Sequence, residues 1–150
     1  MKNTYLLIGL LFISIMAVAE EKKHKKAVAN LTVKTPVLQS FNQKFPEGIA
    51  VSGWEQSPGG NFIAHFEKEG FKQTAEFKPD GSWVKTKVVY AGEQLPEAVQ
   101  HSIKEKYPDA EIDAAEKLFL ENIPAFYKVS LKKDKDGWIV WVNETGIIKE

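Results

Sequence analysis

A ten-residue phrase occurs twice in this chain, as VLQSFNQKFP at residues 37–46 and as VQHSIKEKYP at residues 99–108. In both copies an apolar side chain recurs at every fourth position, which places the three side chains on one stripe of an α-helix. These positions are Val37, Phe41 and Phe45 in the first copy and Val99, Ile103 and Tyr107 in the second. The repeat predicts two short amphipathic helices, each of which depends on another surface to bury its stripe.

Prolines mark both ends of each predicted helix. Pro36 and Pro96 stand near the starts, where a missing amide hydrogen costs nothing, because the first amides of a helix have no intrahelical partner. Pro46 and Pro108 follow the last apolar residue, and proline disfavours helical geometry in the residue before it. Each helix is therefore expected to be about ten residues long.

The sequence after each helix alternates between apolar and polar residues, which is typical of half-buried strands. Eight strands are predicted, at residues 49–56, 62–68, 71–78, 82–90, 112–120, 126–133, 138–143 and 147–150. Short turn sequences such as Pro79-Asp80-Gly81 separate them, so neighbouring strands should run antiparallel.

The strands also repeat, at a shift of sixty-five residues. Phe62, Ala64 and Phe66 match Tyr127, Val129 and Leu131, and Ala75, Phe77 and Gly81 match Val140, Val142 and Gly146. We therefore expect an α+β fold made by tandem duplication of one helix and a four-stranded antiparallel meander, with both helices on one face of the sheet. The halves are predicted as residues 35–92 and 93–150, joined in one cooperative domain.

The first residues resemble an export signal. An apolar run follows Lys2, and Ala17-Val18-Ala19 has the small-x-small pattern of a signal peptidase site. We predict a signal peptide at residues 1–19, cleavage after Ala19, a charged flexible leader at 20–34 and a periplasmic or secreted protein without a membrane anchor. The chain has no cysteine, so a hydrophobic core rather than disulfides must hold the exported fold.

The charge balance argues against a nucleic-acid partner. Without Lys2, 19 lysines against 20 acidic residues leave a formal charge of −1, and every basic residue is lysine. Nucleic-acid-binding proteins usually carry a positive excess and use the forked guanidinium of arginine to hold phosphates.

Several segments resemble the PepSY-like, beta-lactamase-inhibitor-like family of exported bacterial proteins. These are a strand with Trp54, AEFKPDGSWVKT at residues 75–86, LPEAVQHSIKEKYP at residues 95–108 and VWVNETGII at residues 140–148. The resemblance covers nearly all of the chain after about Lys34. It implies a tandem-repeat α+β fold like that of the secreted beta-lactamase inhibitor protein, which grips an enzyme with an exposed sheet face. PepSY-type repeats usually have Asp at the position of Asn143.

No catalytic or metal-binding constellation is recognisable. Of the three histidines, His24 lies in the leader, His65 is expected on an outward strand face and His101 on the polar side of the second helix. Asp134-x-Asp136-Gly137 lacks the remaining ligands of a calcium loop and is better explained as a hairpin turn. We predict no enzymatic activity and no cofactor or metal.

Alternation leaves a distinctive set of side chains on the sheet face away from the helices. The expected set is Ile63, His65, Lys72, Thr74, Glu76, Phe126, Lys128, Ser130, Ile139 and Trp141. Apolar anchors within a polar rim are typical of protein-binding surfaces. The predicted partner-binding residues are Trp141, Phe126, Ile139, Ile63, His65 and Lys128. Trp54 and Trp83 either extend this set or pack in the core or at the sheet edge, and alternation does not decide between the two.

Two functions remain open on this evidence. The first is a protein-binding or inhibitor-like module that lays its sheet face, or the loop at residues 57–61, against another exported or envelope protein. The second is a domain that senses a small molecule or an envelope component in a pocket between the halves, lined by Trp54, Trp83 and Trp141. The sequence leaves the oligomeric state open, and it does not distinguish one continuous sheet from two.

Overall fold

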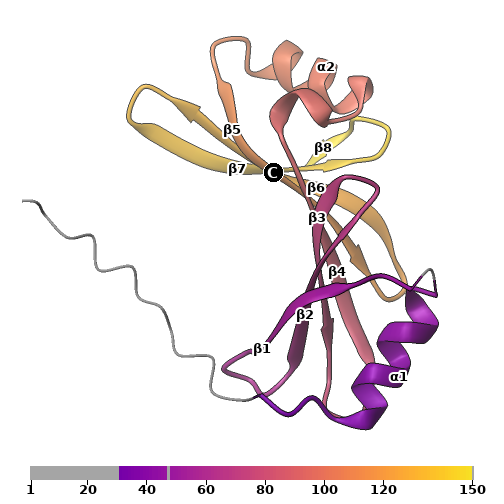
Figure 1. Ribbon diagram of the computed structural model, residues 1–150. Coiled ribbons are helices and arrows are strands. Elements are labelled where there is room, and N and C mark those ends of the chain that lie inside the picture. Colours follow the sequence, from indigo (N-terminus) through magenta and orange to yellow (C-terminus); the bar gives the residue numbers. More distant parts are fainter. Residues whose placement is uncertain (1–30, 47, 150) are drawn as a thin grey trace, which may run out of the picture.

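The computed structural model describes residues 31–46 and 48–149, which form two α-helices and one eight-stranded antiparallel sheet (Figure 1). The α+β class is as predicted. The predicted signal peptide, its cleavage site after Ala19 and most of the predicted leader lie outside the described residues.

The elements follow one another in the same order in both halves. The first half contains α1 (Thr35–Lys44), β1 (Val51–Gln56), β2 (Phe62–Lys68), β3 (Phe71–Phe77) and β4 (Trp83–Tyr90). A short 3-10 helix, η1 (Gly92–Gln94), leads into the second half, which contains α2 (Glu97–Lys106), β5 (Glu111–Leu120), β6 (Ile123–Lys133), β7 (Asp136–Asn143) and β8 (Ile148–Lys149). All eight predicted strands are present, and β6 begins three residues earlier than its predicted start at Phe126.

Both helices end in the same way, immediately before a proline. Phe45 and Tyr107 leave the helical region with φ, ψ angles of −126°, 71° and −130°, 67°. Their backbone N–H groups still donate to the carbonyl oxygens of Phe41 and Ile103, at 2.9 and 2.8 Å. The predicted effect of proline on the preceding residue thus explains both helix ends.

The sheet is continuous, because its strands are hydrogen-bonded in the order β1 to β8. Strand β4 pairs with β5 from Lys85↔Leu120 to Tyr90↔Ala115, and this pairing joins the two halves. In Figure 1 the half that contains α2 lies above the half that contains α1, with β4 and β6 running between them. The sheet is therefore one surface shared by both halves.

Two buried clusters lie on the same side of this sheet, one beneath each helix. The α1 cluster consists of Val37, Phe41, Phe45, Phe62, Ala64, Phe66, Ala75 and Phe77. The α2 cluster consists of Leu95, Val99, Ile103, Ala115, Tyr127, Val129, Leu131, Val140 and Val142. Strand register links them across the sheet, since Ala75 lies opposite Thr86, Thr86 opposite Phe119 and Ala115 opposite Val129. Both helices thus cover one face, as predicted, and the opposite face is called the outer face below.

The turns that follow β3 and β7 have the same hydrogen bonds. Lys78 N–H donates to the Ser82 carbonyl at 2.8 Å, and Asn143 N–H donates to the Ile147 carbonyl at 3.0 Å. Gly81 and Gly146 occupy equivalent places with φ of 93° and 87°, and each packs directly against a helix backbone. The halves therefore share local contacts as well as the order of their elements.

Candidate functional site

The register confirms that all ten predicted residues lie on the outer face. Ile63 lies opposite Glu76 and His65 opposite Thr74, while Lys128 lies opposite Trp141 and Ser130 opposite Ile139. None of these residues belongs to either buried cluster. The two halves nevertheless carry different side chains on this face.

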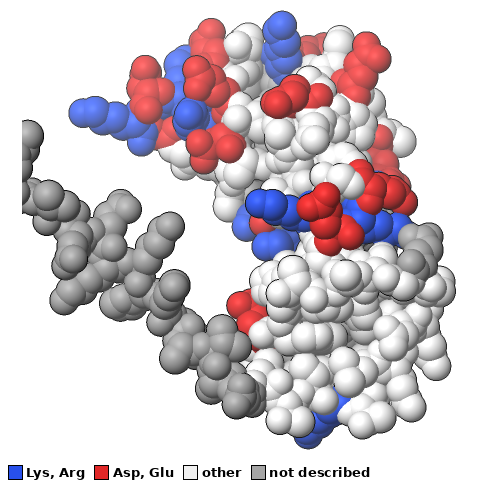
Figure 2. Space-filling view, viewed as in Figure 1, with Lys and Arg blue, Asp and Glu red and all other residues white. Residues whose placement is uncertain are grey.

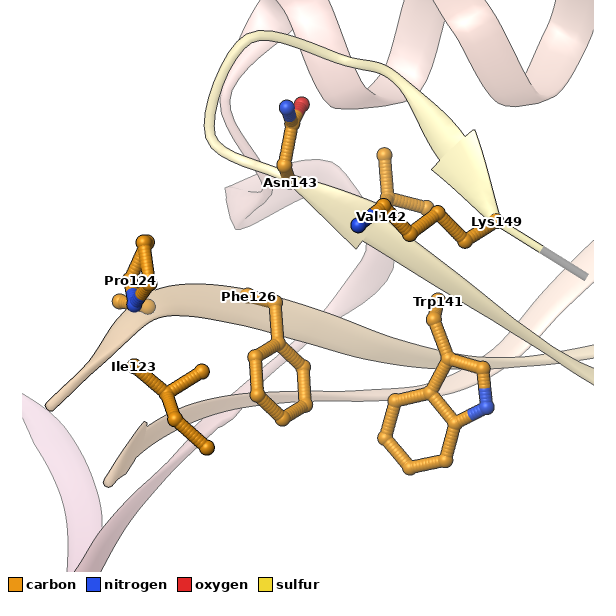
Figure 3. A pocket seen from close by; sticks show the side chains of 8 residues that line it. Ile123, Pro124, Phe126, Trp141, Val142, Asn143 and Lys149 are labelled. Atoms are coloured by element: carbon orange, nitrogen blue, oxygen red, sulfur yellow. The ribbon is translucent and has the colours of Figure 1, made fainter. Parts of the chain in front are cut away.

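The outer face of the second half is apolar. The rings of Phe126 and Trp141, on neighbouring strands, lie 5.5 Å apart with their planes at 71°. Trp141 is 40% exposed and Ile139 is 48% exposed. Figure 3 shows Ile123, Phe126 and Trp141 pointing to the same side of the sheet, away from α2. An open cleft of about 530 Å³ lies among these side chains, Pro124, Ala125, Val142, Asn143 and Lys149.

Three apolar residues of this surface were not predicted. Val89 lies opposite Glu116 on the outer face and is 43% exposed, Leu118 lies opposite Phe126, and Ile123 is 52% exposed. Val89 could have been predicted, because alternation along β4 places it on the same face of the sheet as Lys85 and Lys87. Ile123 precedes the predicted start of β6, and an irregularity in the β5–β6 register brings it opposite Leu120. We define the outer apolar patch as Val89, Leu118, Ile123, Phe126, Ile139 and Trp141.

Two lysines flank Trp141 across the strands. Lys128 on β6 and Lys149 on β8 both lie opposite Trp141 in the register. Glu116 lies opposite Lys128 but forms its ion pair with Lys87, at 3.0 Å. Among the described residues, neither Lys128 nor Lys149 forms an ion pair. Within residues 31–46 and 48–149, the patch therefore lies beside two lysines that have no acidic partner.

The outer face of β1 to β3 is mainly polar, and several of its charged side chains are paired. Glu76 accepts a hydrogen bond from Asn61 Nδ2 at 2.8 Å and lies 3.0 Å from Lys85 Nζ. Burial alone would raise the pKa of Glu76, but the hydrogen bonds from Asn61 and Lys85 outweigh burial and lower it. His65 Nε2 lies 3.5 Å from Glu55. The half-buried Ile63 sits within this polar surface, whereas His65 lines an open groove together with Lys87 and Val89 of the outer apolar patch.

The suggestion that Trp54 and Trp83 extend the outer surface is wrong. Trp54 lies opposite Ala64 and contacts Phe41 edge-on at 5.7 Å between ring centroids. Trp83 lies opposite Phe77, and Lys44 Nζ stands 3.5 Å from its ring centroid. Both indoles pack against the α1 cluster. Single-strand alternation could not assign these faces, because bulges shift the register in β1 and between β3 and β4.

An open groove of about 520 Å³ lies between the two buried clusters on the helix-covered face. It is lined by Trp83, Tyr90 and Phe119 but not by Trp54 or Trp141, so the predicted three-tryptophan pocket does not form. Lys117 lines this groove and already donates to Glu144. Burial would lower the pKa of Lys117, yet its bonds to Glu144 and Tyr127 raise it. The ammonium group is thus engaged within the protein.

The described residues hold no group of three or more His, Cys, Asp or Glu side chains arranged to bind a metal. His101 lies on the exposed side of α2, 3.8 Å from Glu105. Within the same residues, neither α-helix has the length and hydropathy needed to cross a bilayer. Asn143 closes the last turn, where its side-chain oxygen accepts from the N–H groups of Thr145 and Ile147 at 3.0 and 2.7 Å. The amide oxygen of Asn143 accepts these two hydrogen bonds as a carboxylate oxygen of Asp would.

Charged side chains of both signs lie close together where charges gather on the face drawn in Figure 2, and the region below the middle band is largely uncharged. Figure 2 shows red and blue mixed at the tip of the β6–β7 hairpin and in a band across the middle. At the hairpin, Lys133 pairs with Asp109 at 2.8 Å, and Lys132 lies 3.5 Å from Glu111. A phosphate-binding surface would instead show a continuous positive stripe.

Solved structures of several Bacteroides proteins share this fold. A BLIP-like protein from Bacteroides fragilis matches with a TM-score of 0.72 and 19% identity over 80% of this chain and 85% of the other. A DUF2874 family protein from Bacteroides ovatus matches with a TM-score of 0.69 and 21% identity over 80% and 86%. A Bacteroides eggerthii protein described as a "putative periplasmic" protein has a TM-score of 0.65 and 17% identity over 80% and 88%. No curated protein shows significant similarity to the chain.

A protein-family model described as "Putative beta-lactamase-inhibitor-like, PepSY-like" matches residues 61–149. The match includes β2 to β8 and α2, and it begins after α1 and β1. It covers more than half of the chain and includes the α2 cluster, the strand residues of the α1 cluster and the turns at Gly81 and Gly146. The chain therefore belongs to the PepSY-like, beta-lactamase-inhibitor-like family.

Proposed function

We propose that the protein is an exported, non-catalytic binding module that holds another exported or envelope protein against the outer face of its sheet. The outer apolar patch carries this proposal. Large apolar side chains are kept exposed on a face that the helices leave uncovered. Exposed apolar groups that lie together, with a charged rim, are typical of protein-interaction surfaces.

The shape of the patch favours a protein over a small molecule. Its residues extend over four neighbouring strands, β4 to β7, and the cleft among them is open. Small-molecule sites are usually enclosed and converge on a few polar groups. The groove on the helix-covered face is also a poor sensor pocket, because Lys117 is already bonded to Glu144.

Family membership supports an inhibitor-like mode of binding. One relative with this fold is described as BLIP-like, and another is described as periplasmic. We propose that residues 1–19 are a signal peptide, cleaved after Ala19, that sends the chain to the periplasm or outside the cell. The partner is then an exported protein, which an inhibitor-like module would cover with its sheet.

We also propose that the two halves, residues 35–92 and 93–150, arose by tandem duplication. The repeated order of elements and the equivalent contacts of Gly81 and Gly146 support this descent. After duplication the outer faces diverged: the first half kept mainly polar and paired side chains, and all of the apolar patch except Val89 lies in the second half.

The binding function is tested with the mature chain as bait in a periplasmic extract. Wild type is compared with the double variant Phe126→Ala/Trp141→Ala, and the matched control is Leu38→Ala, which removes an apolar side chain that is 41% exposed on α1. Quantitative mass spectrometry should show proteins retained by wild type and Leu38→Ala but lost with the double variant. Equal retention by all three chains, each with an intact circular dichroism spectrum, would contradict the proposal.

A further inference from the structure

Resting on the proposed binding function, we infer that the outer apolar patch recognises an acidic segment of its partner. This segment presents a large apolar side chain flanked by carboxylates. The side chain enters the cleft beside Phe126 and Trp141, and the carboxylates approach Lys128 and Lys149. The partner is thereby specified by the chemistry of its contact segment.

The apolar part of this recognition follows from the cleft. Ile123, Phe126 and Trp141 converge on it from two strands, and its exposed lining is almost entirely carbon (Figure 3). An aromatic or branched side chain placed there would be removed from water and would contact both rings. Aromatic anchors in such clefts usually contribute most of the binding energy of a protein interface.

The acidic part follows from the charges around Trp141. Lys128 and Lys149 lie opposite Trp141 in the register, one on each neighbouring strand, and the described residues offer neither of them an ion pair. The nearest carboxylate to Lys128 in the register, that of Glu116, is bonded to Lys87 at 3.0 Å. Two positive charges beside an apolar cleft attract carboxylates and disfavour basic segments.

The rest of the outer face lacks this combination. In the first half, Lys85 is paired with Glu76 at 3.0 Å. Lys72 is exposed and, among the described residues, forms no ion pair; it lines a groove with Val89, but it lies on β3, four strands away from Trp141 on β7. Lys72 is therefore the matched control for Lys128 and Lys149.

The inference is tested by selecting a random peptide library displayed on phage against the mature chain. Parallel selections use the charge-reversed variant Lys128→Glu/Lys149→Glu and the control Lys72→Glu, each shown to fold by circular dichroism. Wild type and Lys72→Glu should enrich peptides with Asp or Glu beside Trp, Phe or Leu. The charge-reversed chain should enrich Lys or Arg at those positions.

Affinity measurements on the strongest wild-type peptide give a second readout. Lys128→Gln and Lys149→Gln should each weaken its binding about two- to fivefold, as expected for exposed ion pairs, and Lys72→Gln should not. Enrichment of the same charge by wild type and the charge-reversed chain would overturn the acidic-segment inference alone. Peptides that bind Trp141→Ala as tightly as wild type, or a library with no binder above background, would instead contradict the outer apolar patch as the binding surface.

Discussion

At the scale of single residues, the face on which a tryptophan lies determines its role. Trp141 is on the outer face beside Phe126, whereas Trp54 contacts Phe41 within the α1 cluster. Both tryptophans are partly exposed and lie in strands, so residue type and exposure do not show which face each one is on. The cross-strand partner shows the face, because Trp54 lies opposite the buried Ala64 and Trp141 lies opposite Lys128.

Replacing these two tryptophans by alanine should therefore have unequal effects on stability. Trp54→Ala should lower the free energy of unfolding by about 2–4 kcal/mol, since it leaves a gap beside a buried phenylalanine. Trp141→Ala should cost about 1 kcal/mol, the value of one exposed aromatic pair. Urea denaturation followed by circular dichroism measures both. A larger cost for Trp141→Ala would place Trp141 in the core.

Glu76 gives the first half a predictable response to acid. Its pKa is lowered from the ordinary value of 4.5, because the bonds from Asn61 and Lys85 outweigh its burial. The unfolded chain therefore takes up this proton first as the pH falls. The stabilisation by the Glu76 carboxylate is fully present above about pH 4.5 and is lost as the pH falls through the lower pKa of the folded state.

Glu76→Gln should make the free energy of unfolding less dependent on pH between about 5 and 3, because it removes one such carboxylate. Chemical denaturation at a series of pH values measures the slope. An unchanged slope in Glu76→Gln would show that the Asn61 and Lys85 bonds do not favour the ionised form in solution.

At the scale of elements, the helices and the positions of the turns in the sequence were the most predictable part of the fold. The four-residue spacing and the prolines gave both helices, since these signals are local in sequence. The contact of each turn with its helix was not predictable, because it depends on tertiary packing. Gly146 shows this, since a Cβ built there would lie 2.6 Å from the Ala98 carbonyl oxygen.

Gly146→Ala should consequently destabilise the protein by about 3 kcal/mol, through backbone strain at positive φ together with the displaced helix. Gly60→Ala is a matched control, because Gly60 has φ of 85° but no atom within 4 Å of the added Cβ. It should cost about 1 kcal/mol. Thermal and urea unfolding of both variants provide the comparison, and equal costs would show that the contact between turn and helix is unimportant.

The candidate site was less predictable than the fold for a physical reason. Alternation assigns faces within one strand, so it correctly placed Phe126, Ile139 and Trp141 on one side of the sheet. Alternation gives no register between strands, particularly where bulges intervene. It therefore could not show that Trp54 and Trp83 pack against the α1 cluster. The sequence also could not predict that Lys128 forms no ion pair among the described residues, because this depends on which lysine Glu116 binds.

At the scale of the whole molecule, two separate hydrophobic clusters are joined by one sheet. The β4–β5 pairing crosses the boundary, and a chain of aromatic contacts accompanies it from Phe71 to Tyr90 at 4.8 Å and from Tyr90 to Tyr127 at 5.7 Å. Breaking this junction would expose the backbone of two central strands. The halves are therefore expected to unfold together.

Native-state hydrogen exchange tests this cooperativity. Phe41→Ala removes a side chain that is 3% exposed in the first half and should cost about 3–5 kcal/mol. Protection of amides in β6 and β7, in the other half, should fall by the same free energy as protection in β2 and β3. Loss of protection confined to the first half would show two independent units.

The central claim is that the outer face, and not the helix-covered face, holds the partner. The most direct test places a photo-crosslinking amino acid at position 139 on the outer face or at position 38 on α1, in cells that export the chain. Position 139 should give a discrete adduct with an exported protein, and position 38 should give none. Adducts formed from position 38 and not from position 139 would contradict the account.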